Sequence, residues 1–158
     1  MEITIITVGK LKEAFFRDAV SEYIKRLSRF AKCNIIELPD EKIPDNPSEK
    51  QKQQILEKEG NAILAQLKER SFFVTLCVEG KTLSSEEFAQ KIADSAMQTD
   101  RICFAIGGSL GLSDAVKNAS QLRLSFGRMT LPHQLMRVVL CEQIYRAFKI
   151  NANETYHK

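Results

Sequence analysis

The chain has 158 residues, of which 44% are hydrophobic and 27% charged, and its formal net charge is +3; these values are typical of one globular domain with a buried core. No run approaches the roughly 18 apolar residues of a membrane-spanning helix, and the start lacks the features of a signal peptide. Four cysteines form no CxxC pair, and only two histidines accompany them, so no metal site is expected. We expect a cytoplasmic protein that forms a single domain over residues 1–158 and needs no membrane.

Strand-like and helix-like patterns alternate from the first residues onward. Residues 3–8 are β-branched and apolar, which is typical of a strand, and 14–30 carry apolar residues at helical spacing. A second strand is predicted over 33–38. A loop with two prolines follows over 40–47, and then a long helix over 49–69.

The second half of the chain continues the alternation. A strand is predicted over 71–78, ending in a turn at Glu79-Gly80, and Ser84 with Glu87 forms the pattern of a capping box that opens a helix. The remaining elements are a strand over 101–106, a helix over 114–119, a strand over 122–125, a helix from Pro132 to about Ile150, and a polar tail over 151–158. The repeated order predicts an α/β fold, with a mainly parallel sheet and helices on both faces.

Positive charge is concentrated near the C-terminus. Residues 117–158 contain seven Lys or Arg and two acids, a balance of +5, so the other 116 residues carry −2. A solvated helix face with a charged tail explains this distribution as well as a surface for a polyanion does.

In open α/β sheets, ligands bind beyond the carboxyl ends of the strands. Three strand ends here have an unusual composition, at 76–80, 104–111 and 125–133. Gly107 and Gly108 would let the backbone approach a ligand closely, although such a pair is more often a plain turn. Neither a GxGxxG fingerprint nor a Walker A sequence is present.

The last strand end is too apolar for a solvated loop. The run 129–131 must pack in the core, which is the favoured interpretation, or line an apolar pocket. His133 and Arg137 lie four residues apart, so they share a face of the predicted helix. Cys141 has no neighbour that guarantees an activated thiol, and a buried structural role is favoured.

These segments resemble the ribosomal RNA large subunit methyltransferase H family, part of the SPOUT class. The resemblance covers the whole chain. It rests on Gly9-Lys10, Leu76 with Gly80-Lys81, Ile106-Gly107-Gly108, Gly111-Leu112-Ser113, the run 129–138, the helix segment 142–147 and Tyr156-His157.

The resemblance implies a C-terminal deep trefoil knot, a homodimer, and S-adenosyl-L-methionine bound in the knot. It implies methylation of N3 of a pseudouridine in a 23S rRNA stem-loop, within assembled ribosomes. Family cofactor positions fall on Leu76, Gly108, Gly127, Arg128, Met129, Thr130, Leu131 and Pro132. Residues implicated in activity fall on His133, Arg146, Tyr156 and His157.

The acceptor in such a reaction is an imide nitrogen, which becomes nucleophilic only when its proton leaves. His133, His157 and Tyr156 are the candidate proton acceptors, while Arg137 and Arg146 are candidate anion stabilisers or phosphate ligands. Two alternatives from the residues alone are a nucleotide-binding α/β enzyme and a non-catalytic ribosome-associated RNA-binding factor.

Overall fold

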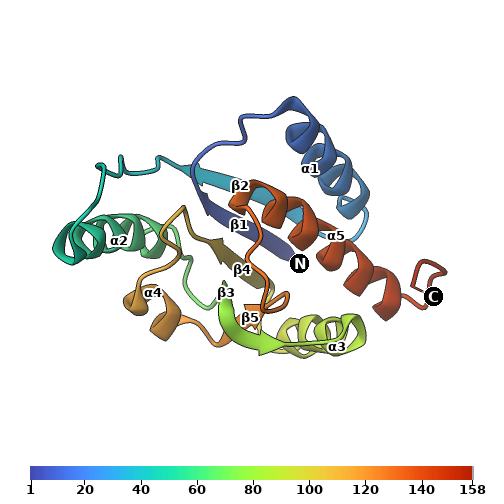
Figure 1. Ribbon diagram of the computed structural model, residues 1–158. Helices are drawn as coiled ribbons and strands as arrows, with labels where there is room; N and C mark the ends of the chain where they lie inside the picture. The colour runs from blue at the N-terminus through green and yellow to red at the C-terminus, as the bar shows by residue number, and fades with distance from the viewer. Residues whose placement is uncertain (158) are drawn as a thin grey trace.

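A computed structural model describes residues 1–157, so Lys158 of the predicted tail lies outside the described part. Its centre is a sheet in which all neighbouring strands pair in parallel, in the order β2-β1-β4-β3-β5 (Figure 1). The strands are β1 (Glu2–Val8), β2 (Lys32–Leu38), β3 (Phe72–Thr82), β4 (Arg101–Ile106) and β5 (Leu122–Ser125). The central strands carry nearly continuous apolar runs because both faces of the sheet are covered.

Helices cover both faces, as the repeated β-then-α order predicts. One face carries α1 (Ala14–Leu27), α3 (Ser85–Ala96) and α5 (His133–Asn151) over a core that includes Ile5 and Phe104. The other face carries α2 (Glu49–Leu64) and α4 (Asp114–Ala119) over Ile6 and Val8 (Figure 1). The predicted α/β fold with a mainly parallel sheet is therefore confirmed.

Local signals in the sequence fix where two of the helices begin. Ser48 and Ser84 each accept a hydrogen bond from a backbone N–H three residues on, and the side chains of Gln51 and Glu87 bond back to complete the capping boxes. The predicted helix over 49–69 is too long, since α2 ends at Leu64 and the chain then turns, with Arg70 at a φ of 60°. Likewise α1 ends at Leu27 rather than at residue 30.

The predicted turn at Glu79-Gly80 is wrong, because β3 continues to Thr82. Leu76 pairs with Leu124 of β5, and Lys81 pairs with the same residue after an irregularity in the register. A bulge of this kind leaves the intervening residues unpaired and redirects their side chains. The bulged residues reach the ligand edge of the sheet, described below.

None of the helices within residues 1–157 is long and apolar enough to cross a membrane. The trefoil knot that the resemblance implies stays a prediction. The strand order is consistent with it, because β3, β4 and β5 are adjacent and their carboxyl ends meet at one edge.

Candidate functional site

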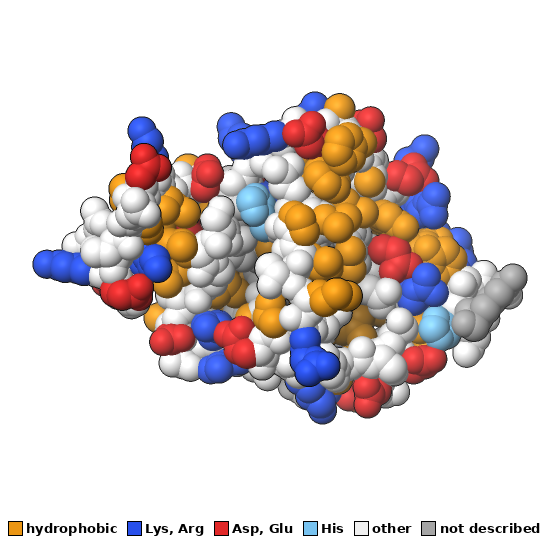
Figure 2. Space-filling view, viewed as in Figure 1, with side chains coloured by type: hydrophobic (Ala, Val, Ile, Leu, Met, Phe, Trp, Pro, Cys, Tyr) orange, Lys and Arg blue, Asp and Glu red, His pale blue; other side chains and the backbone are white. Residues whose placement is uncertain are grey.

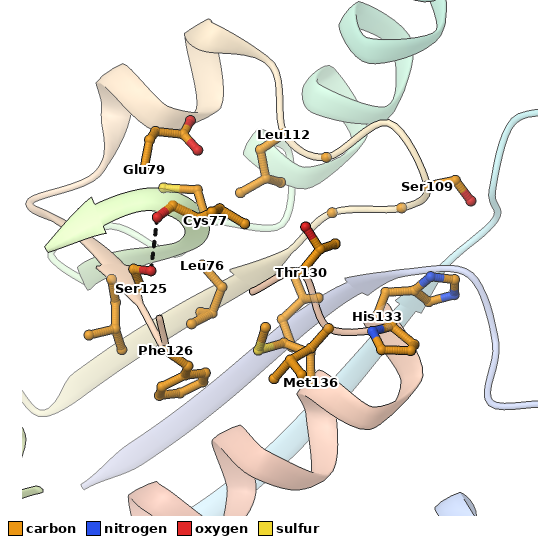
Figure 3. Close-up of a pocket in the computed structure, with 18 of the residues that line it drawn as sticks. Leu76, Cys77, Glu79, Ser109, Leu112, Ser125, Phe126, Thr130, His133 and Met136 are labelled. Atoms are coloured by element: carbon orange, nitrogen blue, oxygen red, sulfur yellow. Dashed lines mark hydrogen bonds between the residues drawn. The ribbon is translucent and has the colours of Figure 1, made fainter. Parts of the chain in front are cut away.

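A cavity of about 520 Å³ lies where β3, β4 and β5 end (Figure 3). Three segments form its walls: the bulged end of β3, the loop after β4, and the stretch that joins β5 to α5. The volume falls within the roughly 300–1,000 Å³ of small-molecule and cofactor sites. Its place, beyond the carboxyl ends of parallel strands, is where an α/β sheet binds ligands.

Most of the positions predicted to contact a cofactor come together at this cavity. The residues that line it are Leu76, Gly108, Gly127, Met129, Thr130, Leu131 and Pro132. Arg128 does not line the main cavity and borders an adjacent hollow of about 490 Å³. A direct contact between a bound cofactor and each of these residues stays a prediction.

The apolar run 129–131 does not pack in the core, so the favoured interpretation of that run is wrong. Met129 is 84% exposed, Thr130 is exposed and Leu131 is half-buried. All three line the cavity instead. An apolar side chain left exposed at the mouth of a cavity suits contact with a ligand or with another protein surface.

Ser125 organises the wall that precedes α5. Its hydroxyl oxygen accepts a hydrogen bond from the Gly127 N–H at 3.2 Å and donates to the Val78 carbonyl at 2.9 Å (Figure 3). The first bond stabilises Gly127 at a φ of +129°, a conformation that residues other than glycine rarely adopt. Sequence reasoning gave Ser125 no role, although a serine two residues before a glycine at a strand end is a turn signal.

The loop after β4 closes on itself by backbone contact. The Gly111 N–H donates to the Gly108 carbonyl at 3.0 Å, and the two glycines form an isolated bridge. A Cβ on Gly107 would lie 2.3 Å from the Gly111 carbonyl oxygen. The pair Gly107-Gly108 thus makes a tight turn and also forms a wall of the cavity.

Replacing Gly107 by Ala should weaken ligand binding in the cavity. The new methyl group would push the backbones of Gly107 and Gly111 apart. Overpacking of this kind costs about 1–3 kcal/mol. We expect the affinity for S-adenosyl-methionine, the cofactor that the sequence resemblance implies, to fall about 5- to 150-fold in calorimetry, with a lower Tm. The control is Ser21→Ala on α1, which is exposed and outside the cavity and should match the wild type; equal affinity in both variants would refute the packing argument.

An ion pair closes the end of the cavity at β3. Lys117 Nζ lies 2.7 Å from Glu79 Oε1, and both residues line the cavity. The hydrogen bond to Lys117 is the main reason that the Glu79 pKa is lowered, and the reciprocal bond raises the Lys117 pKa. Sequence reasoning missed this pair, because 38 residues separate its members and only the bulge in β3 brings them together.

His133 lies at the opposite end of the cavity from Glu79 (Figure 3). A Cβ built on Gly9 would lie 3.8 Å from His133 Nε2, so the ring also meets the end of β1. Burial, and then the positive charge of Arg137, lower the His133 pKa. The imidazole is therefore neutral at pH 7 and able to accept a proton.

Arg137 does not face RNA, which corrects its predicted role. The side chain is 1% exposed and lies 2.9 Å from Glu37 Oε2 through Nη1. Its Nη2 donates to the carbonyl oxygens of Val8 at 3.2 Å and Gly9 at 2.6 Å. The guanidinium thus joins α5 to the carboxyl ends of β1 and β2, and no phosphate could reach it.

The other three residues implicated in activity form a separate cluster. Glu142 Oε1 accepts hydrogen bonds from Arg146, the shortest at 2.6 Å, and from the Tyr156 hydroxyl at 3.3 Å. His157 Nδ1 lies 3.3 Å from Arg146 Nη1, and its Nε2 lies 2.7 Å from Glu86 Oε1. His133 and Arg146 are 13 residues apart on α5, which corresponds to about 20 Å along a helix. Within one chain the cluster is remote from the cavity.

The electrostatics of this cluster favour fixed protonation states. Burial and the nearby Tyr23 and Glu142 raise the pKa of Tyr156 to about 12. The hydrogen bond to Glu142 raises the Arg146 pKa, so the guanidinium stays cationic. In this arrangement Tyr156 is a hydrogen-bond donor, which makes it a weaker candidate for the proton acceptor than His133.

The cysteines supply no activated nucleophile. Burial raises the pKa of Cys141 to about 12 and that of Cys103 to about 12, so the predicted structural role of Cys141 is confirmed. Cys77 is half-buried and lines the cavity, and burial raises the pKa of its thiol as well.

Much of the positive charge near the C-terminus is already paired. Four of the cations that give residues 117–158 their surplus lie within salt-bridge distance of an acid; these are Lys117, Arg137, Arg146 and Lys149. Two of the acids, Glu37 and Glu79, come from the first half of the chain. The surplus in the sequence therefore does not translate into an equally cationic surface.

Comparison with known proteins gives a consistent assignment. The model of a family described as "Predicted SPOUT methyltransferase" matches residues 1–157. The ribosomal RNA large subunit methyltransferase H proteins of Streptococcus pneumoniae strains CGSP14 and D39 are each 54% identical over 159 residues, covering 100% of both chains.

A solved structure supports the fold independently. A probable methylase family protein from Haemophilus influenzae Rd KW20 superposes with a TM-score of 0.56 at 12% identity, over 99% of this chain and 70% of that one. At this identity the likeness concerns the fold alone. The family match and the full-length relatives go further, and by them the chain belongs to the SPOUT methyltransferases, within the ribosomal RNA large subunit methyltransferase H family.

Proposed function

We propose that the protein transfers a methyl group from S-adenosyl-L-methionine to N3 of a pseudouridine in a 23S rRNA stem-loop of the assembled ribosome. The observation that carries the proposal is the cavity between the three strand-end loops, with a neutral His133 at one end. The names of the relatives support rRNA as the substrate. We further propose that residues 1–158 act as one domain in the cytoplasm.

The residues present fit S-adenosyl-methionine. Leu76 and Leu131 supply apolar walls, while the backbones of Gly108 and Gly127 leave room for close approach. The donor carries an activated sulfonium methyl group, so the protein mainly positions donor and acceptor. The Cβ position of Gly127 has nothing within 4 Å, consistent with a backbone that faces open space where a ligand can bind.

His133 is proposed as the group that accepts the N3 proton of the acceptor base. Its ring lines the cavity, and its lowered pKa keeps a lone pair free at neutral pH. The proton would move to a ring nitrogen as the bond between N3 and the methyl group forms and the methyl–sulfur bond breaks, leaving the demethylated thioether product. The base must leave its stack to reach this position, which costs least in a loop.

We propose a homodimer because, within one chain, His133 lies far from Arg146, Tyr156 and His157, the other residues implicated in activity. Hydrophobic side chains form a band over α5 and the start of α1 (Figure 2). Phe15 is 64% exposed and Met129 84% exposed, while Leu135 and Val139 of α5 are half-buried. Exposed apolar area of this kind is typical of a protein–protein interface. A second copy seated there would bring its Arg146, Tyr156 and His157 toward the cavity.

Transfer of a labelled methyl group tests the proposal. We expect label in intact ribosomes and much less in free rRNA. Calorimetry should show S-adenosyl-methionine binding that the demethylated product competes for. A non-catalytic RNA-binding factor would bind ribosomes without binding the donor, and a nucleotide-binding enzyme would bind a nucleotide in its place; either result would refute the methyltransferase reaction proposed here.

A further inference from the structure

The loop that follows β1 places two lysines beside the proposed proton acceptor. Gly9 ends the strand and packs against His133, with a built Cβ at 3.8 Å from Nε2. Lys10 follows Gly9 directly and Lys12 comes two residues later; both side chains are exposed. Lys12 is close enough that its charge contributes to lowering the His133 pKa. Residues far from the basic C-terminal third therefore border this end of the cavity.

Hydrogen bonds from α5 and β2 hold the backbone at the start of this loop. Arg137 donates to the Gly9 carbonyl at 2.6 Å, and Glu37 Oε2 accepts from the Leu11 N–H at 2.9 Å. Leu11 packs against the core. Since the side chain between the two lysines points inward and its N–H is bound, Lys10 and Lys12 project outward from a fixed backbone.

The end of the loop is held by α5 and by α1. The side-chain oxygen of Gln134 accepts from the Lys12 N–H at 3.2 Å, so α5 fixes the loop directly beside His133. Arg17 Nη1 donates to the carbonyl oxygens of Lys12 at 2.7 Å and Leu11 at 3.2 Å. A backbone ordered in advance loses little entropy when a ligand binds its side chains.

The charges of the two lysines are available to a partner. Neither forms an ion pair within residues 1–157, in contrast to four cations of the C-terminal third. Glu37, the acid beneath the loop, is neutralised by Arg137. Glu13 and Asp40 are the acids beside it, and the segment 9–17 carries three cations and one acid, a net charge of +2.

We propose that Lys10 and Lys12, here called the lysine rim, bind backbone phosphates of the RNA stem-loop and hold its extruded base beside His133. This assignment rests on the proposed function, and it places an RNA contact outside the basic C-terminal third. A flexible ammonium is a suitable ligand for a phosphate as a point charge. Such contacts position RNA without reading its sequence.

The double variant K10A/K12A tests the lysine rim, with ribosome binding measured over a range of salt concentrations. Losing two phosphate contacts should weaken binding about tenfold or more near 0.1 M salt, and should reduce the slope of log K against log salt by about 1.4–1.8. The KM for ribosomes should rise by a similar factor. The affinity for S-adenosyl-methionine should stay within about twofold, because neither lysine lines the cavity.

The matched control is K32A/K91A, which removes the same charge from exposed side chains on β2 and α3. Equal binding and equal salt slopes in the two double variants would overturn the lysine rim. Because the readout is binding, it remains decisive if the wild type transfers no methyl group to ribosomes. In that case the proposed reaction fails, while a smaller salt slope in K10A/K12A alone would still support phosphate contact.

Discussion

Replacing His133 by Ala should lower methyl transfer to ribosomes by about 10²–10⁴-fold, the usual contribution of a positioned general base. Affinity for S-adenosyl-methionine should change far less, since the backbone walls of the cavity remain. The ring lines the cavity at the end next to Gly9. Single-turnover transfer of a labelled methyl group, with calorimetry on the same variant, separates the two effects.

The pH dependence gives a second readout of the same residue. The His133 pKa is lowered by burial, so the neutral ring persists below its ordinary value of about 6.5. The wild-type rate should therefore fall only as the pH drops below that value, and His133→Ala should lack this acidic limb. Its residual rate should rise toward alkaline pH, where the acceptor imide loses its proton to solvent.

His157→Ala is the comparison variant for this experiment. His157 lies in the cluster with Arg146 and Glu86, so its loss should lower turnover while the acidic limb stays in place. Wild-type rates in both variants would show that neither histidine accepts the proton. An acidic limb that vanishes only in His157→Ala would move the role to the tail.

Sequence patterns predicted the elements well where local signals determine them. The strand over 101–106, the helix over 114–119 and the strand over 122–125 are confirmed at both ends. The capping box at Ser84 is confirmed by both of its hydrogen bonds. Each of these features depends on residues within a few positions of one another, so a single sequence contains the information.

Several of the misjudged features depend on distant partners. Glu79-Gly80 has the composition of a turn, yet pairing with β5 extends β3 past it. Arg137 has the sequence context of a surface cation, but its partner Glu37 is 100 residues away. Net charge is similarly misleading, since acids from other elements neutralise part of the C-terminal surplus. The sequence pattern alone does not determine these long-range pairings.

In the candidate site, too, some features follow from nearby residues and others depend on distant partners. The glycines and apolar residues that line the cavity follow strand ends, where the fold class already directs attention. Ser125 and Lys117 act through contacts that only the folded chain creates. The lysine rim likewise depends on packing, because Gln134 and Arg17 fix a loop that the sequence shows only as polar residues after a strand.

Arg137→Met should be among the most destabilising single substitutions in this chain. It leaves the Val8 and Gly9 carbonyls without the donor that Arg137 supplies, in a place where the arginine is 1% exposed, and it removes the cation that pairs with Glu37. Leaving a buried carbonyl without its hydrogen-bond partner costs about 1–3 kcal/mol. For a chain of this size, each kcal/mol lost lowers Tm by roughly 2–4 °C.

Arg137→Lys should recover little of this loss. One ammonium cannot reproduce the fork of donors that serves a carboxylate and two carbonyls at once. The control Arg26→Met breaks the exposed pair with Glu22 and should leave Tm unchanged. Because Arg137 anchors Gly9 below the lysine rim, the destabilised variant should also bind ribosomes with a smaller salt slope at temperatures where it remains folded. A variant as stable as Arg26→Met would show that the junction of α5 with β1 holds without the guanidinium.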